Sequence, residues 1–148
     1  MIRDQIHGAA VLDLFAGTGS LSFESLSRGA ESVVAVEISR KSLGILQKNA
    51  QQFEVGSELV VRQSDVEKFL NKYEGTPFDI IFVDPPFTEK LADPVMKTLS
   101  ESAVFSEETE IFIESTKHEP LQKNYGPLTL LNQKSFGDKF LSVFGTDR

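Results

Sequence analysis

Short apolar runs alternate with helix-like segments along most of the chain, and this alternation constrains the fold more than any other feature. Runs rich in β-branched and other apolar residues predict strands at Ala9–Leu14, Ser32–Val36, Glu58–Arg62, Phe78–Val83 and Thr109–Glu114. Between them, apolar residues at helical spacing predict helices at Ser20–Arg28, Arg40–Phe53, Val66–Tyr73 and Leu91–Ser102. Strands connected through helices form right-handed crossovers and a parallel sheet with helices on both faces. The pattern therefore predicts an α/β fold.

The C-terminal part of the chain departs from this alternation. Two strand-like runs, Leu128–Lys134 and Lys139–Phe144, are separated by Phe136-Gly137-Asp138, which leaves no room for a crossover helix. These runs are expected to form an antiparallel hairpin at one edge of the sheet. The prediction is a mostly parallel seven-stranded sheet in a single domain spanning residues 1–148, a length typical of one domain.

Composition excludes several classes of protein and site. The chain has no cysteine, so it has no disulfide, no cysteine-ligated zinc and no thiol nucleophile, and with two histidines no metal site is expected. No apolar stretch is long enough to span a membrane, and the first residues lack a secretory signal, so a cytoplasmic location is expected. The formal net charge is −7, so binding to nucleic acid requires a local basic patch or an additional segment.

A glycine-containing turn follows the first predicted strand. The residues Asp13-Leu14-Phe15-Ala16-Gly17-Thr18-Gly19-Ser20 connect this strand to the first predicted helix. Glycines allow the backbone to approach a ligand closely, and a helix N-terminus offers free N–H donors. In an open α/β sheet, ligands bind at this carboxyl edge of the strands. The turn therefore predicts a nucleotide-type site.

The details of the turn favour a methyl donor over a dinucleotide. The dinucleotide fingerprint requires a third glycine where this chain has Ser22. Asp13 lies four residues before Gly17, still on the strand. A carboxylate at this place suits the amino group and sulfonium of S-adenosylmethionine better than a pyrophosphate.

Two further acidic residues follow the second and third predicted strands. Glu37 ends the second strand and can accept two hydrogen bonds from a ribose diol. As a strand-tip acid it is expected to be exposed, so that its loss leaves folding almost unchanged. Asp65 follows the third strand and has two interpretations, a contact with the adenine amino group or a cap of the next helix.

The tetrapeptide Asp84-Pro85-Pro86-Phe87 closes the most apolar predicted strand. The two prolines stiffen the chain and remove two N–H donors, which leaves carbonyls and the Asp84 carboxylate as acceptors at the ligand edge. Such acceptors can orient an exocyclic base amine and stabilise the positive charge that develops as it attacks a methyl group. The Phe87 ring can stack on a base taken out of its helix.

Together these motifs resemble class I S-adenosylmethionine-dependent methyltransferases that modify exocyclic amines of bases. Val11–Ala30 and Phe82–Phe87 are similar, more closely, to the bacterial 16S rRNA guanine-N2 methyltransferases. The resemblance covers almost the whole chain and implies a Rossmann-like fold, with rRNA or the small ribosomal subunit as partner. It implies that the methyl donor is held by Asp13, Phe15, Gly17, Gly19, Glu37 and Asp65, and the target base by Asp84, Pro85, Pro86 and Phe87.

Two departures and several alternatives accompany this resemblance. Ser22 stands where the family commonly has glycine, and the chain begins only eight residues before Ala9, so the family's basic N-terminal extension is expected to be missing. Within the superfamily, the alternatives are an adenine-N6 or a protein-amine methyltransferase. Outside it, the alternatives are an NAD-dependent oxidoreductase and a non-catalytic remnant that binds only the donor.

Overall fold

The protein folds around one eight-stranded sheet with the strand order β3-β2-β1-β4-β5-β8-β7-β6. The structure is a computed structural model and describes residues 5–147. The parallel strands are β1 (Ala10–Leu14), β2 (Ser32–Glu37), β3 (Leu59–Gln63), β4 (Ile80–Val83) and β5 (Glu110–Thr116). The antiparallel strands that follow are β6 (Asn124–Tyr125), β7 (Leu128–Phe136) and β8 (Lys139–Thr146). The helices are α2 (Ser20–Ser27), α3 (Arg40–Gln52), α4 (Val66–Lys72) and α5 (Ala92–Ser100).

The sheet confirms the predicted α/β fold and hairpin, but the predicted strand number of seven is wrong. The additional strand is β6, which has two residues and pairs with the start of β7 through Tyr125 opposite Leu128. Two residues are too few to form a recognisable β-branched or alternating run. The strand exists because the chain turns back at Gly126, whose φ is 56°, immediately before β7.

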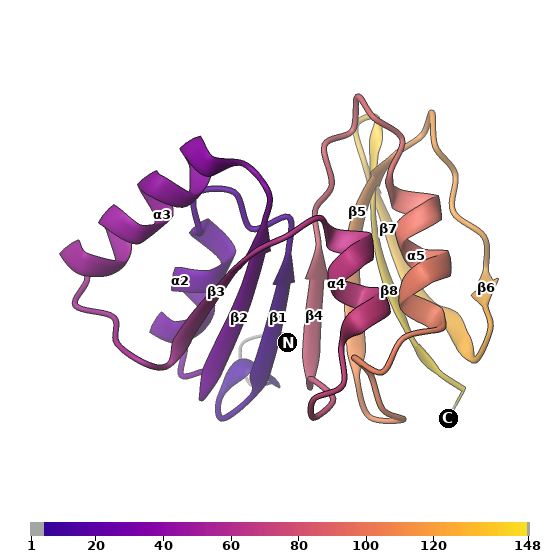
Figure 1. The fold of residues 1–148 in the computed structure, drawn as a ribbon. Helices are drawn as coiled ribbons and strands as arrows, with labels where there is room; N and C mark the ends of the chain where they lie inside the picture. Colours follow the sequence, from indigo (N-terminus) through magenta and orange to yellow (C-terminus); the bar gives the residue numbers. More distant parts are fainter. Residues whose placement is uncertain (1–4, 148) are drawn as a thin grey trace.

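Helices cover the two faces of the sheet in pairs. In Figure 1, α4 and α5 lie in front of the strands, where they bury a large apolar cluster that includes Leu70, Met96 and Ile111. On the other face, α3 places Leu46 against Ala35 of β2. Strand β4 is buried along its whole length, as expected for a continuously apolar strand that lies inside the sheet between β1 and β5.

The side of α2 that faces the sheet combines buried serines with two apolar residues. The spacing of Leu21, Phe23 and Leu26 predicts an apolar inward side, and Phe23 and Leu26 do pack against the buried clusters, whereas Leu21 is 37% exposed. Ser22 and Ser25 are fully buried beside them. Ser25 satisfies its hydroxyl by donating to the carbonyl of Leu21, 2.7 Å away. Small side chains allow the helix to lie close to β1, which positions the glycine turn at its N-terminus.

The N-terminus of α5 lies beside the end of β4 and is held by a distant acid. The Glu119 carboxylate, in the loop after β5, accepts the backbone N–H groups of Ala92 and Asp93 at 3.2 and 3.1 Å. These groups are orphan donors of a helix first turn, and Leu91 at the N-cap position has no side-chain cap to offer them. Glu119 therefore ties the β5 side of the sheet to the loop that connects β4 with α5.

The described residues contain neither a helix that could cross a membrane nor a cluster of metal ligands. No helix within residues 5–147 is long and apolar enough to cross a membrane. The same residues contain no group of three or more histidine, aspartate and glutamate side chains placed to hold a metal ion. The first residues, where no secretory signal is predicted, lie almost entirely outside the described part.

Candidate functional site

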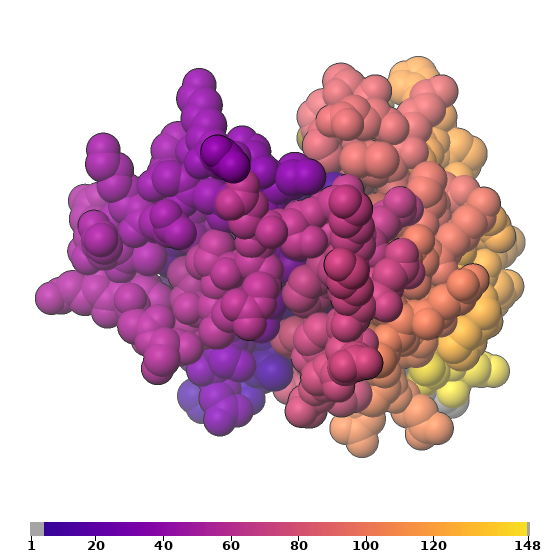
Figure 2. Space-filling model, viewed as in Figure 1, coloured from indigo at the N-terminus to yellow at the C-terminus, as the bar shows by residue number. Residues whose placement is uncertain are grey.

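A cleft of about 610 Å³ opens at the carboxyl edge of the parallel strands. In the sheet order, β1 lies between β2 and β4, so the connections leave β1 and β4 in opposite directions, which is the arrangement that creates a ligand crevice in α/β sheets. Figure 2 shows the surface hollowed between the purple residues of α3 and the pink residues that follow β4. The cleft is lined by Phe15, Gly17, Glu37, Ile38, Ser42, Ser64, Asp65, Val66, Asp84, Pro85, Pro86, Phe87, Glu89 and Leu91.

The turn after β1 requires its two glycines for different reasons. Gly17 has a φ of 59° and open space where a Cβ would stand, so its left-handed conformation, rather than crowding, favours glycine. Gly19 has a φ of 97°, and a Cβ there would lie 2.7 Å from Cε2 of Phe23. Phe15 also adopts a positive φ, of 64°. Gly17 and Phe15 line the cleft, whereas Gly19 is not among its lining residues.

Glu37 fastens the glycine turn to the tip of β2. Its Oε1 accepts the backbone N–H of Gly17 at 2.8 Å, and its Oε2 accepts those of Ile38 and Ser39 at 3.1 and 2.9 Å. The expectation of an exposed strand-tip acid is therefore wrong: the residue is half-buried and bonded to three backbone groups. A carboxylate offers about four lone-pair sites, so Oε1 retains one acceptor site for a ligand hydroxyl.

Asp65 caps α4 and lines the cleft at the same time. Its Oδ2 accepts the backbone N–H of Lys68 at 3.0 Å, the N-cap interaction that the sequence allows. This bond uses one oxygen, and the residue remains exposed. The capping interpretation is confirmed, and the carboxylate keeps acceptor capacity for the adenine amino group that the other interpretation requires.

The Asp84–Phe87 segment presents a carboxylate and an aromatic ring beside each other. Asp84 follows β4 directly, Pro85 is buried beneath it, and the Phe87 ring is 57% exposed. Burial and the neighbouring Glu114 carboxylate raise the pKa of Asp84, while Lys139 opposes this shift. The segment therefore combines a backbone stiffened by two prolines with an exposed aromatic residue.

Two residues that the sequence did not suggest stand behind this segment. Lys139, at the start of β8, places Nζ 3.1 Å from Oε1 of Glu114 and 4.8 Å from the centroid of the Phe87 ring. Glu114 lies near the end of β5. The contact of Lys139 with Phe87 depends on the pairing of β5 with β8, which brings Lys139 opposite Thr116. No local pattern in the sequence indicates the contact between Lys139 and Phe87.

Asp13 lies under the cleft rather than in its wall. It is 1% exposed, and its Oδ2 accepts the Ser22 hydroxyl at 2.6 Å, while its Oδ1 has no hydrogen-bond partner in the described structure. Burial, with smaller contributions from the charges of Asp84 and Glu37, raises the pKa of Asp13 to about 6. The structure therefore brings Asp13 close enough to sense both cleft acids, but does not place it among the lining residues.

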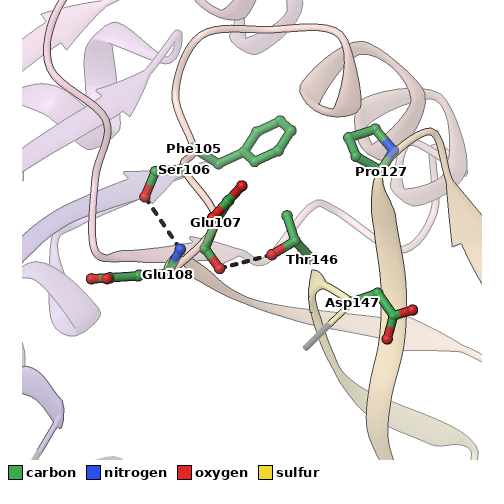
Figure 3. A pocket seen from close by; sticks show the side chains of 7 residues that line it. All are labelled: Phe105, Ser106, Glu107, Glu108, Pro127, Thr146 and Asp147. Carbon is green, nitrogen blue, oxygen red and sulfur yellow. Dashed lines mark hydrogen bonds between the residues drawn. The ribbon is translucent and has the colours of Figure 1, made fainter.

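A second hollow, of about 790 Å³, lies at the opposite edge of the sheet and contains none of the predicted site residues. Figure 3 shows its lining, in which the Thr146 hydroxyl donates to the Glu107 carbonyl at 2.8 Å and the Glu108 N–H donates to the Ser106 hydroxyl at 3.3 Å. This edge holds the amino ends of the parallel strands, where α/β sheets do not bind their ligands. We therefore assign the candidate site to the carboxyl edge.

The mostly parallel sheet, the C-terminal antiparallel strands and the cleft at the carboxyl edge define a Rossmann-like fold of the methyltransferase type. Comparison with known proteins agrees with this class. The chain belongs to the family described as "Conserved hypothetical protein 95", whose profile matches residues 1–145.

Several proteins that are similar to this chain carry methyltransferase names. The ribosomal RNA small subunit methyltransferase D of Haemophilus influenzae is 38% identical over 137 residues, covering 89% of this chain and 69% of that protein. Its namesake from Escherichia coli is 37% identical over 72% of this chain, which spans 53% of that protein. A crystal structure from Haemophilus influenzae described as a "putative methylase" superposes with a TM-score of 0.88 at 33% identity, covering 99% of this chain and 92% of the other.

Proposed function

We propose that this protein transfers a methyl group from S-adenosylmethionine to the exocyclic N2 amine of a guanine in small-subunit (16S) rRNA. The named relatives support methylation of ribosomal RNA, and the motifs described above support the donor and the base amine. Residues 1–148 form the methyltransferase domain in this proposal.

The charge of the cleft is the observation that carries the proposal. The described lining residues include Glu37, Asp65, Asp84 and Glu89, but no lysine or arginine. Asp13 adds a buried carboxylate beneath them, with one oxygen unsatisfied. Such a site attracts a ligand that carries an ammonium and a sulfonium, and it repels a pyrophosphate. This argues for S-adenosylmethionine and against the NAD-dependent alternative.

The residues present fit this donor. Glu37 keeps an acceptor site on Oε1 for a ribose hydroxyl, and Asp65 offers its carboxylate to the adenine amino group. When bound, S-adenosylmethionine supplies a methyl group on a sulfonium that is already an activated leaving group. Gly17 leaves open space where any other residue would have a Cβ, so its backbone can lie against the ligand.

Asp84 and Phe87 act on the acceptor base. The Asp84 carboxylate accepts an N–H of the amine and stabilises the positive charge that the nitrogen gains during attack. The rigid backbone at Pro85 and Pro86 holds this acceptor in place, so little reorganisation is needed at the moment of transfer. The exposed face of Phe87 stacks on the flipped base.

The test is a methylation assay followed by identification of the modified nucleoside. Purified protein, 16S rRNA transcript or isolated small subunits, and methyl-labelled donor are combined, and the RNA is digested to nucleosides. The expected product is N2-methylguanosine. N6-methyladenosine, labelled ribosomal protein, or donor binding without transfer would each support one of the alternatives instead. Titration calorimetry with S-adenosylhomocysteine and NAD tests the donor class independently.

A further inference from the structure

None of the described residues that line the acidic cleft is a lysine or an arginine that could bind the phosphates flanking the target base. Glu37, Asp65, Asp84 and Glu89 line it, and the whole chain carries a formal net charge of −7. Phosphate contacts provide most of the affinity of proteins for nucleic acids. The substrate strand therefore requires a basic surface next to the cleft rather than within it.

Lysines are concentrated in the segment between the end of β5 and the start of β8. Residues 117–139 contain four lysines against Glu119 and Asp138, the reverse of the balance in the chain as a whole. Glu119 is directed at the backbone of α5. This segment thus forms a locally positive region in an otherwise acidic protein.

Strand pairing brings three of these lysines to the tip of the β7–β8 hairpin. Lys139 stands opposite both Thr116 of β5 and Phe136 of β7, and Lys134 stands opposite Leu141. Lys117 donates its backbone N–H to the carbonyl of Asp138 at 2.9 Å, and its Nζ lies 5.7 Å from the centroid of the Phe140 ring of β8, so the residue lies against the hairpin. We call Lys117, Lys134, Phe136 and Lys139 the tip surface. In Figure 1 this tip lies at the same edge as the loop that follows β4.

The tip surface is continuous with the base-binding end of the cleft. Lys139 contacts the Phe87 ring, with Nζ 4.8 Å from its centroid, and is only partly exposed. Phe136, which pairs with Lys139 across the hairpin, exposes 50% of its surface at the turn. Lysines interleaved with exposed aromatic rings are the chemistry that holds single-stranded nucleic acid, through phosphate contacts and base stacking.

We infer that the tip surface binds the RNA strand next to the target nucleotide, with phosphates on Lys117 and Lys134 and a neighbouring base stacked on Phe136. The inference rests on the proposed function for the nature of the substrate. The strand then passes Lys139 and delivers the target base to Phe87. In this arrangement the hairpin supplies the positive charge that the cleft lacks.

The charge part of the inference is tested with a matched pair of double variants. Lys117→Gln with Lys134→Gln removes two charges from the tip surface and leaves Lys139 and the cleft unchanged. Lys48→Gln with Lys72→Gln removes two exposed lysines near the C-terminal ends of α3 and α4 and serves as the control. Binding of 16S rRNA transcript is measured across a salt series. The tip variant is expected to reduce the slope of log affinity against log salt by about 1.5, and to weaken binding roughly ten- to thirtyfold at about 0.1 M salt.

The stacking part is tested by Phe136→Ala, with Phe136→Tyr as the conservative variant. The alanine variant is expected to weaken RNA binding by roughly five- to a hundredfold without changing the salt slope, whereas tyrosine retains binding. Affinity for S-adenosylhomocysteine and the melting temperature are expected to stay at wild-type values in both variants.

Several outcomes overturn the inference. A tip double variant that binds transcript as tightly as the control double variant, or a neutral Phe136→Ala, shows that the RNA does not use this surface. Unchanged binding to transcript with lost binding to small subunits shows that the surface contacts a ribosomal protein. The proposed function can fail separately. If the wild-type protein transfers no methyl group while its RNA binding depends on the tip surface, the inference stands and the proposed activity is contradicted.

Discussion

In the proposed function, Asp84 stabilises the transition state of methyl transfer and contributes little to binding of the donor. Its carboxylate follows β4 directly, where a partly desolvated charge helps most as the amine becomes positive. Asp84→Asn keeps the shape and one acceptor oxygen but removes the charge, so single-turnover methylation is expected to fall about 10²- to 10³-fold. Affinity for S-adenosylhomocysteine and the melting temperature, measured on the same preparation, are expected to change little. Near-normal turnover would contradict the catalytic assignment.

Glu37 is expected to affect both donor binding and stability. Glu37→Ala removes an acceptor for the ribose, and the affinity for S-adenosylhomocysteine measured by calorimetry is expected to fall about ten- to a hundredfold. Because three backbone N–H groups also lose their acceptor, the free energy of unfolding is expected to fall by about 1–3 kcal/mol. Affinity is compared well below the melting temperature of the variant. Unchanged affinity would remove Glu37 from the donor site.

Asp13 makes stability depend on pH. Its pKa in the folded protein is about 6, above the ordinary value of 3.8. Between these two pH values, the folded state therefore holds a proton that the unfolded state has released. The stabilisation is therefore complete below about pH 3.8 and is lost as the pH rises through 6, a change of about 3 kcal/mol. Asp13→Asn is expected to remove this part of the pH dependence in urea titrations. If the free energy of unfolding depends on pH in the same way in the variant and the wild type, the role of Asp13 in this dependence is contradicted.

Substitutions of Asp65 test whether the residue that caps α4 also contacts the ligand. Asp65→Ser keeps a side-chain oxygen for the N-terminus of α4, so the melting temperature is expected to stay close to wild type. Asp65→Ala removes the cap and is expected to lower the free energy of unfolding by about 1 kcal/mol. If the carboxylate also binds adenine, both variants lose affinity for S-adenosylhomocysteine. Normal donor affinity in Asp65→Ser would leave the residue as a cap alone.

The elements themselves follow from local patterns to differing degrees. The buried β4 strand and its Asp84 tip are evident because a continuously apolar run followed by prolines has few alternatives. The β6 strand is not evident, since two residues carry no period and pair with β7 only after the chain has turned. The inward side of α2 follows its apolar pattern at Phe23 and Leu26 but not at Leu21, because close packing on β1 also buries the small side chains of Ser22 and Ser25.

For the whole molecule, the acidic cleft predicts selective stabilisation by ligands. S-adenosylhomocysteine at 100 times its dissociation constant is expected to add about 2.7 kcal/mol to the free energy of unfolding. For a chain of this size that corresponds to a rise of about 5–10 °C in melting temperature, measurable by scanning fluorimetry. NAD at the same concentration is expected to give no shift, because its pyrophosphate meets the carboxylates of the cleft. A shift with NAD would contradict the donor assignment.

Local patterns in the chain are enough to predict the order of the parallel strands and their helices, and the acidic or glycine-containing strand tips that form the wall of the cleft. These features are local: a parallel strand–helix repeat sends every strand's carboxyl end to one edge, so Gly17, Glu37, Asp65 and Asp84 meet there whatever the rest of the chain does. Tertiary packing, in contrast, buries Asp13 beneath the cleft with one oxygen unsatisfied and brings Lys139 against Phe87. Burial and strand register join residues far apart in the chain, and no spacing between neighbours encodes them.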